Sequence, residues 1–133
     1  LRMKQHCSNA EKVVSFLETQ KKVKNVIYPT NHQGEIKERA KKYMQGGYGS
    51  LVGMDLGTKE AGAKFIDNLK MLYHVANIGD ARSLAIHPAT TTHSQLDDAA
   101  LAAAGVTPGY VRLSIGIEHP DDIIADIKQA LAA

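Results

Sequence analysis

The sequence predicts an α+β fold in which helices cover a mainly antiparallel sheet. Residues 110–118 alternate strictly between apolar and polar side chains, which indicates a strand with one buried face. Residues 3–17 repeat apolar side chains at spacings of three and four, as an amphipathic helix does. The chain has 133 residues, of which 44% are hydrophobic, and it shows no internal repeat or linker. A single domain over residues 1–133 is therefore expected.

In the first half of the chain, the patterns predict two helices and two strands. The opening helix, over residues 3–17, presents an apolar stripe of Met3, Cys7, Ala10, Val14 and Leu17. A short strand is expected over residues 23–28, where Pro29 ends it. A second helix over residues 36–44 has an apolar side of Ile36, Ala40, Tyr43 and Met44. In residues 51–56, the side chains of Val52, Met54 and Leu56 fall on one side, which predicts a second strand.

The second half predicts three helices and two further strands around a long irregular segment. Thr58 is the N-cap of a third helix, and residues 72–76 form an apolar strand. Residues 77–95 have no helical period and are rich in Gly, Asp, Ser and Thr, so we expect a long loop there. A short alanine-rich helix over residues 97–104 precedes the strand at 110–118. The last helix begins at Pro120, a residue favoured at a first helical position.

The composition excludes several classes of protein. Sixteen basic against fourteen acidic side chains give a net charge of +2, so neither a nucleic-acid nor a membrane partner is expected. No apolar run approaches the roughly 20 residues that span a bilayer. The single cysteine, Cys7, cannot form an internal disulfide, which is typical of a reducing, cytoplasmic environment.

The opening of the chain predicts that it is part of a longer polypeptide. Leu1 already lies in the helical pattern, with no capping residue and no initiator methionine before it. We therefore expect a missing upstream segment and a contact surface that this segment would cover.

Three candidate sites have simpler explanations. The six histidines contain no pair at the i, i+4 spacing of a helical zinc site, so no metal is expected. The glycines at 46, 47 and 49 precede a strand and not a helix, which favours a turn over a phosphate loop. The lysines of residues 37–42 could contact RNA, but no aromatic side chain lies between them, and a solvated helix face is the better interpretation.

Arg112 is the strongest candidate for a binding residue. It lies in the middle of the 110–118 strand, on the polar face, so packed neighbours hold its backbone. A rigid guanidinium can bind a carboxylate through two parallel hydrogen bonds. A structural ion pair with an Asp or Glu is the alternative. The hydroxyls of Thr90, Thr91 and Thr92 leave a similar choice between capping a turn and binding a ligand.

Three longer motifs resemble one family. Residues 77–84 read NIGDARSL, residues 87–96 read HPATTTHSQL, and residues 111–118 read VRLSIGIE. Together they are similar to the C-terminal domain of the Cys/Met-metabolism family of pyridoxal-phosphate (PLP)-dependent enzymes. The resemblance extends over essentially the whole chain and implies the small C-terminal domain of a fold-type I PLP enzyme.

The resemblance also implies an activity and a set of site residues. Residues 76–80, ANIGD, are most similar to the O-acetylhomoserine sulfhydrylase branch, which makes homocysteine or methionine from O-acetylhomoserine and sulfide or a thiol. By position, Arg112 matches the arginine that binds the substrate's α-carboxylate, Asn77 and the Ile78 backbone match its helpers, and Thr92 matches a threonine beside that site. No catalytic residue is expected in this chain. PLP would be bound by the missing upstream domain, and the whole enzyme is expected to be a cytoplasmic homotetramer that acts in methionine biosynthesis.

Two alternatives remain open at this point. The first is a methionine or cystathionine γ-lyase or γ-synthase of the same family, against which Asn77 argues mildly because many relatives carry Ser there. The second belongs to another class: a non-catalytic α+β module that binds an amino acid through Arg112.

Overall fold

The computed structural model describes residues 1–133 and confirms the α+β class. Five strands form one sheet in the order β1-β2-β5-β4-β3, in which every neighbouring pair is antiparallel except β3 and β4. The strands are β1 (Asn25–Ile27), β2 (Leu51–Asp55), β3 (Tyr73–His74), β4 (Leu84–Ile86) and β5 (Tyr110–Ser114). The helices are α1 (Arg2–Glu18), α2 (Gly34–Tyr43), α3 (Lys59–Asp67), α4 (Asp98–Ala103) and α5 (Pro120–Ala132), with short 3-10 turns η1 (Pro29–Asn31) and η2 (Pro88–Thr90). None of the helices combines the length and the apolarity that a bilayer crossing needs.

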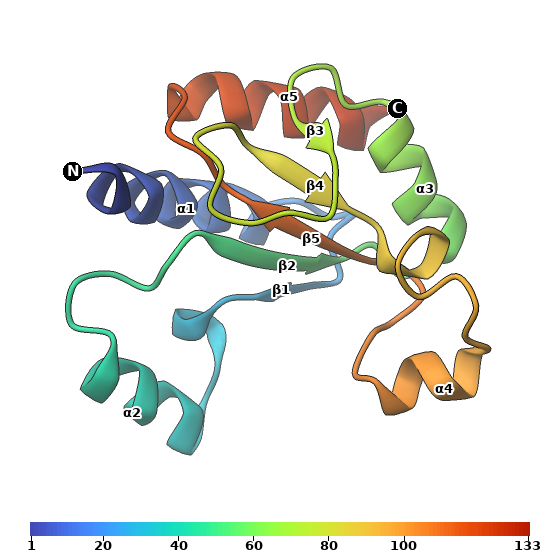
Figure 1. Ribbon diagram of the computed structural model, residues 1–133, viewed down its shortest axis with the longest axis horizontal. Helices are drawn as coiled ribbons and strands as arrows, with labels where there is room; N and C mark the ends of the chain where they lie inside the picture. The colour runs from blue at the N-terminus through green and yellow to red at the C-terminus, as the bar shows by residue number, and fades with distance from the viewer.

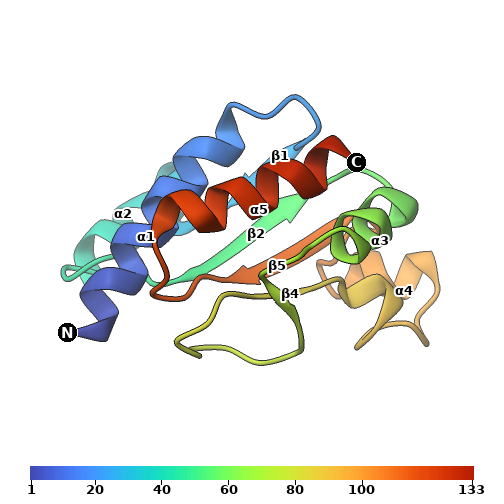
Figure 2. The ribbon, with the colours of Figure 1, turned by 90° about the horizontal axis from the view of Figure 1, so that it is seen from above.

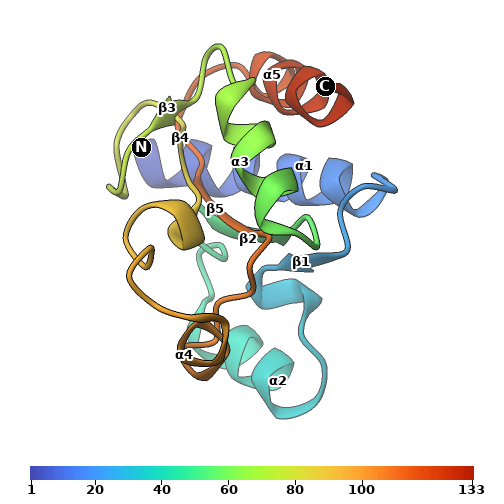
Figure 3. The ribbon, with the colours of Figure 1, turned by 90° about the vertical axis from the view of Figure 1, so that its right-hand side faces the viewer.

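Helices α1, α3 and α5 form one layer on one face of the sheet (Figure 1). Helices α1 and α5 lie side by side and run roughly along the strands, and α3 packs beside α5 (Figure 2). Viewed from the end, α1, α3 and α5 lie on one side of the sheet, whereas α2 and α4 lie on the other (Figure 3). The face of the sheet toward α2 and α4 therefore lacks a closed helical layer.

The core lies between the sheet and the layer of α1, α3 and α5. The alternation predicted for β2 and β5 is confirmed, because Val52, Met54, Val111 and Leu113 are completely buried. Met54 lies opposite Val111 in the antiparallel register, so the two side chains are neighbours on the buried face of the sheet. Each such side chain contributes about 1.5–3 kcal/mol of hydrophobic stabilisation when it is fully buried.

The apolar stripes of the first two helices behave differently from each other. In α1 the stripe is buried at Cys7, Ala10, Val14 and Leu17, and only its first side chain, Met3, is exposed, at 59%. In α2 only Ala40 is buried, while Ile36 and Tyr43 are exposed. The apolar side of α2 is not buried, because α2 lies away from the layer of α1, α3 and α5.

Strand lengths and one strand were predicted incorrectly. The strand expected over 23–28 is reduced to β1, and the one expected over 72–76 to the two residues of β3. The segment expected to be a loop over 77–95 contains β4, whose residues Leu84–Ile86 are all buried. A strand that is covered on both faces shows no alternation, which is why the pattern missed it.

The strand expected over 110–118 ends at Ser114. Beyond this point, side chains of α1 bind the backbone that the sheet no longer pairs. Nδ1 of His6 lies 2.6 Å from the Ile115 carbonyl oxygen, and Nδ2 of Asn9 donates to the carbonyl oxygen of Gly116 at 3.0 Å. Both α1 side chains are buried, and they direct residues 115–118 toward the helical layer.

Candidate functional site

Arg112 projects from the centre of the sheet on the face that α1, α3 and α5 do not cover. It pairs with Gly53 of β2 and Ile86 of β4, and its neighbours Val111 and Leu113 point into the core. Its backbone is therefore fixed on both sides. The structural ion pair considered as an alternative is not found, because the four ion pairs of the chain involve other residues.

The loop over residues 75–83 brings Asn77 to Arg112. Nη2 of Arg112 donates to the Asn77 carbonyl oxygen at 3.3 Å, although 35 positions separate the two residues. The backbone N–H of Ile78 donates to Oδ1 of Asn77 at 2.9 Å. The Asn77 side chain therefore accepts the hydrogen bond of the next residue's N–H group. The structure thus brings Asn77 into contact with the Arg112 guanidinium and bonds Ile78 to Asn77, while their role in binding substrate stays a prediction.

Thr92, the fourth predicted residue, has no hydrogen bond to Arg112, Asn77 or Ile78. Its side chain is exposed, and its hydroxyl lies 2.8 Å from Nδ1 of His93. The neighbouring hydroxyls of Thr90 and Thr91 both donate to the His87 carbonyl oxygen. The capping interpretation is therefore confirmed for these two threonines, whereas a role for Thr92 stays a prediction.

A tyrosine and an open apolar groove flank Arg112. The groove has a cavity volume of about 520 Å³ and runs between α2 and strands β1 and β2. Its lining includes Ile27, Ile36, Leu51 and Tyr110. Burial raises the pKa of Tyr110, and the nearby positive charge of Arg112 opposes this shift. The phenol is therefore neutral beside the guanidinium, and Arg112 is the cationic group at this end of the groove.

None of the lysines in this chain is buried, whereas a lysine that forms a Schiff base works in a desolvated site. The binding of PLP by an upstream domain stays a prediction. Gly47 and Gly49, at φ angles of 129° and 82°, lead into β2 and not into a helix N-terminus, which confirms the turn interpretation. No group of three or more His, Cys, Asp or Glu side chains is arranged to hold a metal ion.

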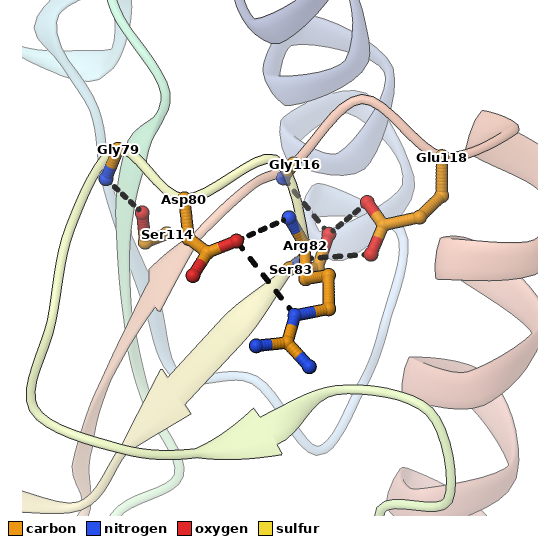
Figure 4. Close-up of polar contacts among 7 residues, drawn as sticks. All are labelled: Gly79, Asp80, Arg82, Ser83, Ser114, Gly116 and Glu118. Atoms are coloured by element: carbon orange, nitrogen blue, oxygen red, sulfur yellow. Dashed lines mark hydrogen bonds and ion pairs between the residues drawn. The ribbon is translucent and has the colours of Figure 1, made fainter.

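Sequence reasoning missed the polar side chains that hold the 75–83 loop. Ser83 and Glu118 bind each other, and Ser114 and Gly116 complete the set (Figure 4). The alternation of residues 110–118 predicted that Ser114 and Glu118 lie on the polar face of the strand. It did not indicate which residues they bind. The partner residues lie more than thirty positions away, so no local pattern could identify them.

Comparison with known families gives the class of this protein. The sequence pattern of the family described as "Cys/Met metabolism PLP-dependent enzyme" matches residues 1–132. The chain therefore belongs to this family of PLP-dependent enzymes.

Individual relatives indicate a branch of the family. The chain is 49% identical to the O-acetyl-L-homoserine sulfhydrylase of Leptospira meyeri, over 98% of this chain and 30% of that protein. It is 43% identical to the L-methionine gamma-lyase of Fusobacterium nucleatum subsp. polymorphum, over 98% of this chain and 33% of that protein. The chain thus spans about a third of the length of the curated relatives it matches.

A solved structure has the same fold. The chain superimposes on a Campylobacter jejuni protein assigned as an O-acetylhomoserine (thiol)-lyase with a TM-score of 0.90 and 41% sequence identity. The match covers 99% of this chain and 32% of that one, which carries a pyridoxyl-lysine monophosphate. The expected fold, that of a domain of a PLP-dependent enzyme, is confirmed by this likeness. Its place at the C-terminal end of the complete enzyme stays a prediction.

Proposed function

We propose that residues 1–133 form the C-terminal domain of a PLP-dependent O-acetylhomoserine sulfhydrylase, in which they bind the α-carboxylate of the amino-acid substrate. The complete enzyme converts O-acetylhomoserine and sulfide, or a thiol, into homocysteine or methionine, and releases acetate. In O-acetylhomoserine, the bond between Cγ and the acetoxy oxygen breaks, and a C–S bond forms at the same carbon. We further propose a cytoplasmic homotetramer that acts in methionine biosynthesis.

The free guanidinium of Arg112 is the observation that carries this proposal. An arginine without an acidic partner, on a strand fixed from both sides, is prepared for a planar anion. A carboxylate accepts two parallel hydrogen bonds from such a group, which sets both its position and its orientation. In this role Asn77 holds the guanidinium from one side, and the backbone of Ile78 and the hydroxyl of Thr92 are further contacts to the bound amino acid.

The chain supplies the receptor for the carboxylate and not the cofactor site. PLP, when bound, would supply the electron sink for the carbanionic charge that expels acetate, and sulfide would then add to the electrophilic carbon that acetate leaves behind. Because no lysine of this chain is buried, we assign the cofactor lysine and the phosphate contacts to an upstream domain. The isolated domain is accordingly inactive, and its contribution is orientation of the substrate.

A γ-lyase is the second candidate, and the 43% identity to the Fusobacterium L-methionine gamma-lyase favours it. Product analysis of the protein encoded by the complete reading frame separates the two reactions. A sulfhydrylase forms acetate and homocysteine from O-acetylhomoserine and sulfide, whereas a lyase releases ammonia and an oxoacid. Formation of the latter pair alone would contradict the proposed activity.

The non-catalytic amino-acid-binding module is tested by the same reading frame. A module of this kind would bind an amino acid through Arg112 without any upstream cofactor domain. Calorimetric binding of O-acetylhomoserine to a protein that carries no PLP lysine would support the module and contradict the enzyme.

A further inference from the structure

The loop over residues 75–83 is held mainly by polar contacts. It joins β3 to β4, which are parallel neighbours, although parallel strands usually need a connection of about a dozen residues. Its apolar side chains give little support, because Val75 is 45% exposed and Ile78 is 55% exposed. The position of Asn77 therefore depends on hydrogen bonds elsewhere in the loop.

Ser83 and Glu118 form the strongest of these contacts (Figure 4). The backbone N–H of Ser83 donates to Oε1 of Glu118 at 2.6 Å, and the Ser83 hydroxyl donates to Oε2 at 2.8 Å. The same hydroxyl accepts the backbone N–H of Gly116 at 2.9 Å. Ser83 is completely buried, so both oxygens of one carboxylate are used to fix a buried residue at the end of the loop.

Two further hydrogen bonds join the loop to the same segment of chain. The backbone N–H of Gly79 donates to the hydroxyl of Ser114 at 3.2 Å, and the backbone N–H of Ile117 donates to the Ala81 carbonyl oxygen at 2.8 Å. Glu118 is itself anchored, since Nδ2 of Asn9 donates to its carbonyl oxygen at 2.8 Å. All of these contacts end on residues 114–118, directly after Arg112 in the chain.

We infer that Glu118 and Ser83 are positioning residues that hold the Asn77 carbonyl against the guanidinium of Arg112. This inference rests on the proposed function of Arg112 as the carboxylate receptor. The strand of Arg112 and the loop of Asn77 form one rigid unit because Glu118 binds Ser83. Without the Glu118 carboxylate, the buried N–H and hydroxyl of Ser83 lose their acceptors, the loop shifts, and Arg112 loses its lateral support.

The test uses Glu118→Gln and Ser83→Ala in the complete enzyme, with Glu60→Gln as the matched control. Glu60 lies on α3, is exposed and forms no ion pair. We expect the KM for O-acetylhomoserine to rise about tenfold in both variants, as the loss of a hydrogen bond to a charged group predicts. The kcat, the KM for sulfide and the absorbance of bound PLP should stay at the wild-type values, as should every parameter of the control.

Two comparisons separate this positioning role from a general loss of stability. Inhibition by an amine analogue without an α-carboxylate should be equal in wild type and Glu118→Gln. On an Arg112→Ala background, Glu118→Gln should raise the KM no further, because the two residues act on one interaction. If Glu118→Gln does not fold, Ser114→Ala, which removes only the bond to Gly79, should still raise the KM by a few fold.

The outcomes distinguish the inference from the function on which it rests. If Arg112→Ala leaves the KM for O-acetylhomoserine unchanged, the proposed function is wrong. If Arg112→Ala raises it while Glu118→Gln, Ser83→Ala and Ser114→Ala leave it unchanged, the function stands and the positioning role is overturned. Equal losses for substrate and for the amine analogue would also overturn it.

Discussion

The carboxylate of Asp126, on α5, accepts the backbone N–H of Leu72 at 2.9 Å. It also accepts the N–H groups of Lys70 and Met71, each at 2.9 Å, and Nε2 of Gln129 at 3.0 Å. The side chain is buried. One carboxylate thus fixes the turn between α3 and β3 against the last helix.

This contact predicts a loss of stability in acid. Burial raises the pKa of Asp126, but the hydrogen bonds from Leu72, Lys70 and Met71 outweigh it and hold the pKa below its ordinary value. The stabilisation is therefore present above the unfolded pKa of about 4 and is lost as the pH falls through the folded pKa. We expect Asp126→Asn to lower the free energy of unfolding by about 2 kcal/mol near neutral pH.

Urea unfolding of the chain, measured from about pH 7 to about pH 3, checks this prediction. The difference in unfolding free energy between wild type and Asp126→Asn should shrink toward the acid end. Asp67→Asn, at an exposed position at the end of α3, is the control and should follow the wild type. A difference that does not change with pH would contradict the assignment.

His87 predicts a second loss of stability on acidification, in a pH range above that of Asp126. Nε2 of the buried ring lies 2.7 Å from the Pro108 carbonyl oxygen, and Nδ1 lies 2.9 Å from the Thr90 hydroxyl. Burial lowers the pKa of His87, and this effect exceeds the opposing effect of the hydrogen bond to Pro108. Because the unfolded chain then takes up the proton more readily, stability should fall as the pH drops below about 6.5.

The variant His87→Gln should remove this part of the pH dependence while lowering stability at every pH. Thermal unfolding between about pH 8 and about pH 5 measures both effects. His32→Gln, at a partly exposed position beside η1, should keep the wild-type slope. A wild-type slope in His87→Gln would show that another group titrates in this range.

Replacement of Gly62 by alanine should destabilise the chain, although helix propensity alone predicts the opposite. In the middle of α3 an alanine should stabilise the helix by up to about 1 kcal/mol. However, a Cβ at this position would overlap with Nε2 of His87 and lie 2.7 Å from its Cδ2. Overpacking of a buried site outweighs propensity, so Gly62→Ala should destabilise the chain by about 1–3 kcal/mol.

The melting temperature of Gly62→Ala, compared with that of Gly46→Ala, checks this expectation. Gly46 lies in a turn where an added Cβ meets no atom within 4 Å and the φ angle is not positive. A melting temperature for Gly62→Ala equal to or above the wild type would mean that the imidazole can move aside.

The helices and the central strands could be predicted because each has one buried face. In β2 and β5 the core takes every second side chain, so Met54 and Val111 appear in a period of two. Strand β4 is short and buried on both faces, which leaves no period to detect. The apolar side of α2 was detected, but periodicity does not tell which surface an apolar side will meet, and Tyr43 is 71% exposed.

The candidate site depended on information that local patterns do not contain. The alternation of residues 110–118 placed Arg112 on a polar face, and this much followed from the sequence. The contact with Asn77 joins a loop and a strand that are 35 positions apart in the chain. The family resemblance indicated this contact, whereas no rule of local spacing could do so. The pairing of Ser83 with Glu118 needed three-dimensional coordinates, because each residue alone is an ordinary polar side chain.

The isolated chain should not bind PLP at a specific lysine. All of its lysines lie at least partly exposed, and an exposed lysine forms only a weak, reversible Schiff base. After incubation with PLP and borohydride reduction, peptide mass spectrometry should find scattered, substoichiometric labelling. One pyridoxyl-lysine at a single position in every chain would contradict the assignment of the cofactor site to an upstream domain.

The last prediction concerns Arg112 in the complete enzyme. Lysine offers a point charge in place of a planar fork, so Arg112→Lys should weaken the binding of the substrate carboxylate, and Arg112→Ala should weaken it more. For alanine the loss in kcat/KM should correspond to about 2–5 kcal/mol, because a desolvated carboxylate loses its ionic partner. Steady-state kinetics with O-acetylhomoserine measure this loss.

Arg39→Ala is the matched control for Arg112. Arg39 lines the same groove from α2, and its only ion pair is an exposed contact with Glu35 at 3.6 Å. Its removal should leave kcat/KM within about twofold of the wild type, because exposed ion pairs contribute little. PLP absorbance should be the same in all three Arg112 and Arg39 variants, since we assign the cofactor contacts to an upstream domain. Loss of PLP from Arg112→Ala, or an equal loss for substrate and for an analogue without the α-carboxylate, would make Arg112 a structural residue and not the receptor.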